Sequence, residues 1–431
     1  MSLPRAQFVI HGIGTLVTPA RVPAPIRGGD LASVVEIADA AIAIDDAGVI
    51  LAAGVESEVR AAIGTDGDTR FHDARGALAL PGLVDCHTHP VFAGDRAAEF
   101  ELRNLGAGYE AIHAAGGGIR ASVARTREAL DANAIAPQVR RHLDWMLASG
   151  TTTAEGKSGY ALTVEHELES LRVLQAVAGK HPIRMTRTLL AAHTVPVEYD
   201  GRPDDYIDEV AIPAAQRAVR DVRATAADVF LERGSFDRAQ AARYLRAAQA
   251  AGLVARMHGD QFSDQGGIEL AIELGARSID HLEALEPDAP RLRALAQSEV
   301  ASVLLPASSL FLNRPYAPGR ELADAGAIVV VASDFNPGSS YAESLPLAMS
   351  LACIGSRLRA AEVLTACTVN AAWVLGLEDR VGRLDAGWRG DVVLLDQPSL
   401  AHLPYHVGSP AVSAVFVGGM EVDLRGGGGR G

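Results

Sequence analysis

The pattern of apolar and polar positions changes twice along the chain. The first 75 or so residues contain short apolar runs separated by turn signals, which predict strands at 7–10, 40–44 and 49–53. The turn signal Asp45-Asp46-Ala47-Gly48 favours a hairpin between the last two of these strands. Short strand patterns return near the other end of the chain, at 391–395, 414–417 and 420–422. We therefore expect strands from both ends of the chain to form one small β-sandwich domain.

The middle of the chain alternates apolar runs with longer helical patterns. An apolar run at 77–84, interrupted by Pro81-Gly82, predicts a first strand. Seven further strands are expected at 151–155, 183–190, 229–231, 253–258, 278–281, 301–305 and 328–332. Helices are expected between them at 137–147, 164–178, 212–224, 238–251 and 268–274. Eight strands with intervening helices predict an α/β protein with a (β/α)8 barrel.

These patterns give a predicted division of the chain into three segments. Residues 1–78 would form the N-terminal part of the small β-domain, and residues 79–378 would form the barrel. Residues 379–431 would complete the small domain and end in a flexible glycine-rich tail at 426–431.

Histidines and one aspartate occur where barrel strands are expected to end. His87 and His89 close the first strand, and side chains two residues apart on a strand point to the same side. His258 and His281 end the fifth and sixth strands, and Asp334 follows the eighth. Any one of the last three would more often be a structural hydrogen-bonding group. Together, at the carboxyl ends of strands where barrel active sites lie, they predict a mononuclear metal site formed by His87, His89, His258 and Asp334.

A metal held in this way would lower the pKa of a bound water toward about 7. Asp334 would then accept the proton of the attacking water. His281 is not needed as a fourth ligand, so we expect it to polarise the carbonyl under attack or to orient the nucleophile.

Composition excludes several other classes of function. The chain has 431 residues, 48% of them apolar and 21% charged, as in ordinary soluble globular proteins. Its net charge of −14, without a basic stripe, argues against a nucleic-acid partner. No apolar run approaches the roughly 20 residues of a membrane span, and no signal-peptide pattern is present. Three cysteines without framework spacing, Cys86, Cys353 and Cys367, favour a reducing cytoplasm.

The motif from Pro81 to His89, with His258, His281 and Asp334 downstream, resembles the amidohydrolase superfamily. Several longer stretches are more specifically similar to the imidazolonepropionase family of histidine degradation. They include 92–96, 100–103, 115–119, 150–160, 192–199 and 333–340, the last containing Asp-Phe-Asn-Pro-Gly-Ser. The similarity extends over nearly the whole chain and is weakest before about residue 75 and after Arg425.

The resemblance implies hydrolysis of 4-imidazolone-5-propanoate to N-formimidoyl-L-glutamate with one zinc or iron ion per chain, in a homodimer. Its metal ligands fall on His87, His89, His258 and Asp334. Its substrate contacts fall on Arg96, Tyr109, Tyr160, His193, Gln261, Asn336, Gly338 and Ser339. Arg96 suits the propionate carboxylate because a guanidinium forms two parallel charge-assisted hydrogen bonds, and Tyr160 and His193 would add donors.

Two positions depart from the family pattern. Some members have a glutamate, proposed as a base, where this chain has Gln261, which cannot accept a proton. We therefore assign that duty to Asp334, with His281 as a second candidate, and expect Gln261 to bind the amide edge of the ring. Gly156 replaces an expected bulkier residue and should leave space beside Lys157, which we expect to be structural and paired with an acid.

Two alternatives stay open at this point. Another cyclic-amide or amidine hydrolase, or a deaminase on the same scaffold, would keep the metal ligands without the residues that bind a carboxylate. A binding protein without catalysis would be expected to lack metal ligands, and none is missing here.

Overall fold

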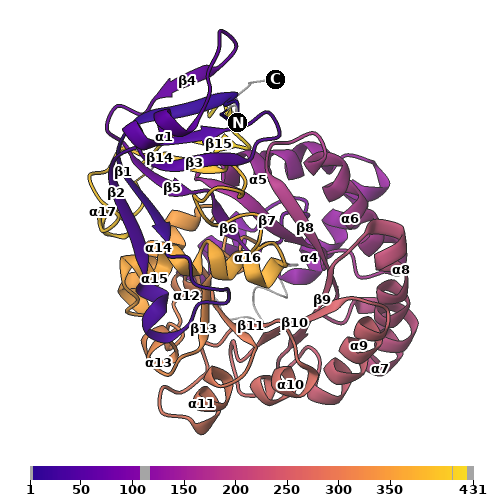
Figure 1. Ribbon diagram of the computed structural model, residues 1–431. Coiled ribbons are helices and arrows are strands. Elements are labelled where there is room, and N and C mark those ends of the chain that lie inside the picture. The colour runs from indigo at the N-terminus through magenta and orange to yellow at the C-terminus, as the bar shows by residue number, and fades with distance from the viewer. Residues whose placement is uncertain (1–2, 107–116, 410, 425–431) are drawn as a thin grey trace.

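The computed structural model describes residues 3–106, 117–409 and 411–424, and they form a parallel barrel with a mixed β-sheet beside it (Figure 1). Neighbouring barrel strands are parallel and follow one another in chain order. They are β6 (Leu83–Asp85), β7 (Thr151–Lys157), β8 (Arg184–Ala192), β9 (Ala226–Leu231), β10 (Val254–Gly259), β11 (Ser278–His281), β12 (Ala301–Leu304) and β13 (Ile328–Val331). The predicted barrel is confirmed.

The barrel closes between its first and last strands, just beyond their carboxyl ends. A parallel bridge joins Thr88 to Phe335, and the backbone N–H of His89 donates to the carbonyl of Phe335 at 2.8 Å. Thr88 lies between His87 and His89, so closure of the barrel fixes the backbone that carries both histidines.

Helices surround the barrel strands in the part of the chain that the structure describes (Figure 1). The longer ones are α4 (Ile119–Asp131), α5 (Ala136–Ala148), α6 (Val164–Ala178), α8 (Ile212–Val222), α9 (Arg238–Ala250), α10 (Gly267–Leu274) and α14 (Leu345–Gly355). The shorter ones are α2 (Ala97–Asn104), α7 (Pro203–Tyr206), α11 (Pro290–Ala296), α12 (Pro306–Phe311), α13 (Gly319–Asp324), α15 (Ala360–Ala366), α16 (Val369–Leu375) and α17 (His402–Tyr405), with the turns η1 (Gly28–Ala32), η2 (Val197–Tyr199) and η3 (Ile207–Ala211). Helix α1 (Glu56–Ala62) instead packs against the second sheet. None of these described helices combines the length and the apolar character needed to cross a membrane.

The helices that sequence patterns locate best have capping residues at their starts. Helix α6 begins after Thr163, whose hydroxyl accepts the backbone N–H of His166 at 3.2 Å. Helix α9 begins with a capping box between Asp237 and Gln240. Such caps satisfy N–H groups that have no partner within the helix, so they define where a helix starts.

The second sheet contains strands from both ends of the chain, as predicted. Its order is β16–β15–β14–β5–β1–β2–β3, with β4 paired to β1. The strands are β1 (Phe8–Pro19), β2 (Val34–Ile44), β3 (Ile50–Val55), β4 (Arg70–Asp73), β5 (Leu78–Pro81), β14 (Val392–Leu395), β15 (Val412–Val417) and β16 (Met420–Glu421). Its core joins the two ends of the chain, since Ile10 and Ile42 belong to the same buried cluster as Val392 and Phe416.

The apolar run at 77–84 differs from its prediction as one strand. It forms β5 in the small sheet and then β6 in the barrel, with Gly82 between them. A Cβ atom at Gly82 would lie 2.2 Å from Oγ1 of Thr152, which is fully buried. Glycine is therefore needed where the chain passes from one sheet to the other.

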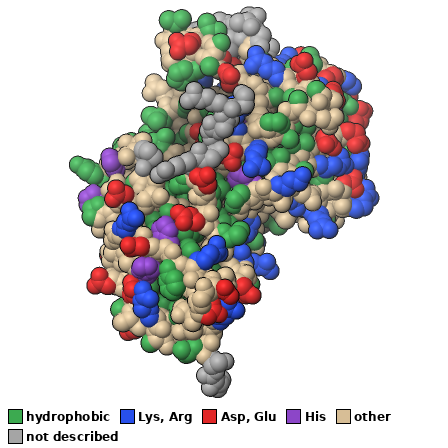
Figure 2. Space-filling view, turned by 90° about the horizontal axis from the view of Figure 1, so that it is seen from above, with side chains coloured by type: hydrophobic (Ala, Val, Ile, Leu, Met, Phe, Trp, Pro, Cys, Tyr) green, Lys and Arg blue, Asp and Glu red, His purple; other side chains and the backbone are tan. Residues whose placement is uncertain are grey.

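Acidic and basic side chains are interspersed on the face of the molecule seen in Figure 2, and no basic stripe crosses the described part of that face.

Candidate metal centre and substrate pocket

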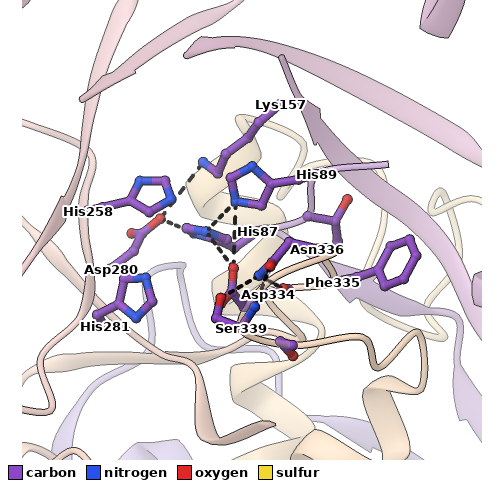
Figure 3. A network of polar contacts seen from close by, with 12 residues as sticks. His87, His89, Lys157, His258, Asp280, His281, Asp334, Phe335, Asn336 and Ser339 are labelled. Carbon is purple, nitrogen blue, oxygen red and sulfur yellow. Dashed lines mark hydrogen bonds and ion pairs between the residues drawn. The ribbon is translucent and has the colours of Figure 1, made fainter. Parts of the chain in front are cut away.

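The five residues predicted at strand ends come together at one end of the barrel (Figure 3). His87 and His89 follow β6, His258 and His281 lie in β10 and β11, and Asp334 follows β13. The backbone φ angles of His281 and Asp334 are 92° and 54°. Residues other than glycine adopt such angles at a cost of about 1–3 kcal/mol and do so most often at functional sites.

The candidate ligand atoms are close to one another. The Nε2 atoms of His87 and His89 are 3.3 Å apart, and Oδ1 of Asp334 lies 3.4 Å from the first and 3.6 Å from the second. His87, His89 and His258 have ligand atoms that all lie within 4.8 Å of one another. The same is true of His87, His281 and Asp334, so His87 belongs to both groups. The four predicted ligands thus belong to one cluster, with His281 beside them.

Two buried aspartates determine which nitrogen faces the centre. Nδ1 of His87 lies 2.5 Å from Oδ2 of Asp280, and Nδ1 of His258 lies 3.0 Å from Oδ1 of Asp228. A proton on each Nδ1 satisfies these carboxylates and leaves Nε2 of both rings as an acceptor. Nε2 of His258 is buried and has no hydrogen-bond partner in the described structure. Acceptor atoms therefore converge without a donor, which is the chemistry of a cation site, and these residues fit a divalent metal ion.

The pKa values at the centre reflect the attraction between its histidines and carboxylates. Burial alone would lower the pKa of His87, but Asp280 and Asp334 raise it to about 9. Burial alone would raise the pKa of Asp334, but the neighbouring imidazoles of His87, His89 and His281 hold it well below its usual range. A carboxylate that remains ionised when buried is available as a metal ligand and as a proton acceptor.

A buried ionic layer lies beneath the metal ligands. Nζ of Lys157 contacts Oδ2 of Asp228 at 2.6 Å and Oε2 of Glu155 at 2.8 Å. Arg256 contacts Glu155 and lies 3.0 Å from Oδ2 of Asp280. All five side chains are at most 1% exposed. The expected pairing of Lys157 with an acid is present, and the layer joins the two aspartates that orient His87 and His258.

Sequence reasoning did not identify the other members of this layer. Their signal was present, because Glu155, Asp228, Arg256 and Asp280 are charged residues inside the stretches predicted or observed as barrel strands. Charged side chains are almost never fully buried unless they are paired.

The expected space at Gly156 is not present. A Cβ atom there would lie 2.3 Å from Cδ2 of Leu174 on α6 and 3.3 Å from Cγ of Pro90. Gly156 thus allows α6 to pack closely against β7, and that prediction was wrong.

A pocket of about 770 Å³ opens over the centre. It is lined by His89, His258, His281 and Asp334 together with the predicted substrate contacts Arg96, Tyr160, His193, Gln261, Asn336, Gly338 and Ser339. Tyr109, also predicted to lie nearby, is outside the described residues.

Arg96 lies against the loop that follows Asp334. Its Nε donates to Oγ of Ser122 at 3.0 Å, and its Nη1 is 3.8 Å from Oε1 of Glu99. A Cβ atom at Gly338 would lie 2.5 Å from Nη1 of Arg96. Gly338 therefore leaves room for the guanidinium in the pocket.

His193 differs from the donor that we expected. Its Nδ1 lies 2.9 Å from the carbonyl of Gly159, and burial together with His258 lowers its pKa to about 3. A neutral ring that donates from Nδ1 presents an acceptor at Nε2, which suits a ring N–H of a substrate rather than a carboxylate. Tyr160, by contrast, retains its proton because burial raises its pKa, so it remains a donor.

Two other predicted contacts have contrasting surroundings. The Asn336 side chain accepts from the backbone N–H groups of Gly338 and Ser339 at 2.7 and 2.8 Å and donates to the carbonyl of Asp334 at 2.6 Å. The Asn336 side chain therefore stabilises the conformation of the loop at 334–339. The Gln261 side chain, 6% exposed, makes no hydrogen bond among the described residues and is free to meet a ligand.

Among the pocket residues that were not singled out from the sequence, Glu232 and Arg103 hold neighbouring backbone in place. Glu232 accepts the backbone N–H groups of Phe262 and Ser263 at 2.8 and 3.2 Å, and so holds the segment that follows Gln261. Arg103 donates to the carbonyl of Gly338 at 3.3 Å. Its signal lay in the 100–103 stretch already noted for its family resemblance.

A search of protein families matches residues 78–422 to the Amidohydrolase family. With the barrel and its strand-end histidines, this match defines the class of protein: the chain belongs to the amidohydrolase family. Within that class it belongs with the imidazolonepropionases. It is 49% identical to the imidazolonepropionase of Rubrobacter xylanophilus over 96% of this chain and 97% of that protein, and 43% identical to that of Symbiobacterium thermophilum over 95% of each.

Solved structures show the same fold at much lower sequence identity. The guanine deaminase of E. coli superposes with a TM-score of 0.72 at 17% identity, over 99% of this chain and 100% of that one. A zinc-bound adenosine deaminase from Xanthomonas campestris gives 0.67 at 21% identity, over 97% and 93%. At these identities the similarity supports the fold and does not indicate a substrate.

Proposed function

We propose that this protein hydrolyses the ring C–N bond of 4-imidazolone-5-propanoate and releases N-formimidoyl-L-glutamate, in histidine degradation. The observation that carries the proposal is the presence of Arg96 in the same pocket as the cluster of metal-ligand atoms. A guanidinium and a hydrolytic centre in one pocket suit a cyclic amide that carries a carboxylate. The relatives of this chain that bear the imidazolonepropionase name support the same reaction.

One zinc or iron ion would be held by His87, His89, His258 and Asp334. When bound, the ion would supply a water whose pKa is lowered to about 7 and would polarise the ring carbonyl. The convergence of buried acceptor atoms supports this ligand set.

The proton transfers are assigned to two residues of the chain. The carboxylate of Asp334 would accept the proton of the attacking water and return it to the ring nitrogen as the C–N bond breaks. Burial would lower the pKa of His281, but Glu283, at 3.4 Å from Nδ1, raises it. His281 would therefore donate a hydrogen bond to the carbonyl oxygen under attack.

The other pocket residues would orient the substrate. Arg96 and Tyr160 would bind the propionate carboxylate, and His193 would accept a ring N–H at Nε2. The amide of Gln261 has both a donor and an acceptor and would pair with the amide edge of the ring. Gln261 cannot hold the reacting proton, so Asp334 is the base in this scheme.

Turnover of imidazolonepropionate by the metal-loaded protein, followed by loss of its ultraviolet absorbance, tests the proposal. His89→Ala should remain folded and lose both metal and turnover, because it removes one ligand of the centre. His166→Ala removes a partly exposed imidazole on α6 and should keep both. Two metal ions per chain at full occupancy would contradict the mononuclear site, and a metal-loaded protein without turnover would overturn the reaction.

A substrate screen separates this reaction from those of other amidohydrolases. An uncharged imidazolone should be a poor substrate, because Arg96, whose acidic neighbour Glu99 is 3.8 Å away, would lose the substrate carboxylate as a partner in a partly desolvated pocket. Losing such a contact costs about 2–4 kcal/mol, on the order of a 30- to 1,000-fold effect. A deaminase would instead release ammonia from an aminated ring.

We also propose a cytoplasmic homodimer without a nucleic-acid partner. The three cysteines are free, which is consistent with a reducing compartment, and the described surface in Figure 2 has no basic stripe. Analytical ultracentrifugation of the metal-loaded protein tests the dimer.

A further inference from the structure

The side chains of Arg96 and Arg103 both line the pocket and both lie beside Gly338. Arg96 is the residue at the N-cap position of α2, and Arg103 lies in the last turn of this helix. The two are seven residues apart and therefore lie on a similar face of the helix. They lie against Gly338 on two sides. Nη1 of Arg96 would be 2.5 Å from a Cβ atom at Gly338, and Nη2 of Arg103 donates to its carbonyl at 3.3 Å.

The acid nearest these two arginines does not balance their charge. Glu99 is also on α2, and its Oε1 is 3.8 Å from Nη1 of Arg96. Its other oxygen accepts the backbone N–H of Gly118 at 2.8 Å. Ser122, the other side chain that contacts Arg96 among the described residues, is neutral. Two cations thus share one partly engaged carboxylate, so this part of the pocket has a positive charge that an anion would neutralise.

Arg103 is held in place by neighbours that leave its charge unpaired. Its guanidinium carbon lies 5.1 Å from the ring centre of Phe311 and 5.9 Å from that of Phe100. Its Nε is buried and has no acceptor in the described structure. Burial, opposed by Glu99 and reinforced by Arg96, lowers the pKa of Arg103. A stacked arginine that lines the pocket and has no acid paired with it is well suited to bind a carboxylate.

We propose that Arg103 is a specificity-determining residue that binds the substrate carboxylate together with Arg96. This inference rests on the proposed function, because it concerns the carboxylate end of that substrate. A purely structural role, in which Arg103 only supports the loop through the Gly338 carbonyl, predicts a different result. Loss of loop support would impair every substrate, whereas loss of a carboxylate contact would impair charged substrates alone.

Steady-state kinetics of the metal-loaded enzyme with two substrates separate these roles. The substrates are imidazolonepropionate and an imidazolone that carries a neutral ethyl group in place of the propionate. Arg103→Met should raise KM for the propionate substrate by about 10-fold or more, with kcat nearly unchanged, and should leave kcat/KM for the neutral substrate unaltered. Arg103→Lys keeps the positive charge but lacks the two parallel N–H donors of a guanidinium. It should raise KM by a smaller factor, again for the propionate substrate alone.

Arg277→Met is the matched control. Arg277 also stacks on an aromatic ring, that of Trp373 at 4.3 Å, and donates to a backbone carbonyl, but it does not line the pocket. Its replacement should leave both substrates unaffected. Metal content and thermal unfolding of each variant establish that it is folded, and Arg103→Lys supplies the comparison if Arg103→Met is unstable.

The outcomes distinguish this inference from the proposed function. If the parent enzyme turns over the propionate substrate and Arg103→Met has an unchanged KM, the inference on Arg103 is overturned and the function stands. Equal losses with both substrates would also overturn it in favour of loop support. A parent enzyme without turnover would overturn the proposed function, and this inference with it.

Discussion

Nδ1 of His87 and Oδ2 of Asp280 are 2.5 Å apart in the interior of the barrel, and both side chains are fully buried. This contact fixes the imidazole with its Nε2 lone pair toward the metal centre. Asp280 is in turn held by Arg256 at 3.0 Å. The orientation of a metal ligand therefore depends on a residue that does not itself reach the metal.

We expect Asp280→Asn to weaken metal binding by about 10- to 100-fold. An asparagine amide can donate to Nδ1 as well as accept from it, so the favoured tautomer of His87 is no longer enforced. Titration with metal in the presence of a competing chelator measures the affinity. Asp144→Asn is a matched control, because Asp144 pairs with His181 at 3.0 Å outside the pocket, and its metal affinity should equal that of the parent. Equal affinities for Asp280→Asn and the parent would contradict this role.

Gln261 and Asp334 should respond differently to substitution. Gln261→Glu should retain turnover within about 10-fold, because orientation of the ring needs no titratable group at this position. Asp334→Asn should lose a factor of about 10³ or more, because it removes the proton acceptor and one metal ligand. Initial rates at saturating metal measure both. If Gln261→Ala were as inactive as Asp334→Asn, the assignment of the base to Asp334 would be wrong.

Gly82 should be intolerant of any side chain. Gly82→Ala would place Cβ within 2.2–2.9 Å of three Thr152 side-chain atoms, at the junction of the two sheets. Such overpacking costs about 1–3 kcal/mol, which denaturant unfolding would detect. Thr152→Ala removes the two nearest of these atoms, so the double variant should be less destabilised than the sum of the single ones. Gly29→Ala, at a glycine with no atom within 4 Å of a built Cβ, should be nearly neutral.

Much of the barrel could be predicted because its elements carry strong local signals. The helix predicted at 164–178 is observed over the same residues, since Thr163 caps its start. The N-terminal strands β1 and β2 are longer than predicted because their buried apolar runs are interrupted. In β1, half-buried residues at 11–12 and 14–15 precede the buried Leu16 and Val17, and β2 begins with the mostly exposed stretch 34–39. The split at Gly82 depends on Thr152, which is 70 residues away in the sequence. No local pattern contains that information.

The candidate ligands could be identified because strand ends in a barrel meet in space. The charged strand residues beneath them are visible in the sequence, but their pairing could not be predicted. Whether Glu155 and Lys157 face Asp228 depends on the register of β7 against its neighbours. The protonation state of His193 likewise could not be predicted from the sequence. It follows from the carbonyl of Gly159 and from burial beside His258, both of which are properties of the folded chain.

His142 makes the stability of the fold depend on pH. Its ring is 1% exposed, stacks on Phe92 and has Nδ1 at 2.8 Å from the carbonyl of Pro90. Burial lowers its pKa from 6.5 to about 4, although the carbonyl of Pro90 opposes this shift. The folded protein therefore keeps His142 neutral under mildly acidic conditions in which the unfolded chain binds a proton.

The free energy of unfolding should accordingly fall as the pH is lowered from 6.5 to 4. The unfolded state binds more protons than the folded state in this window, so acid favours unfolding, and the contribution of His142 is fully present above pH 6.5. The loss from this residue should reach roughly 3 kcal/mol by pH 4. His142→Asn keeps a donor for the Pro90 carbonyl without a titratable group. Between pH 6.5 and pH 4 the unfolding free energy of this variant should therefore fall by roughly 3 kcal/mol less than that of the parent. Denaturant unfolding of both proteins at pH 7, 6, 5 and 4, with the same metal content, makes the comparison. Parallel pH profiles would show that His142 binds its proton equally well in the folded and unfolded states, contrary to this account.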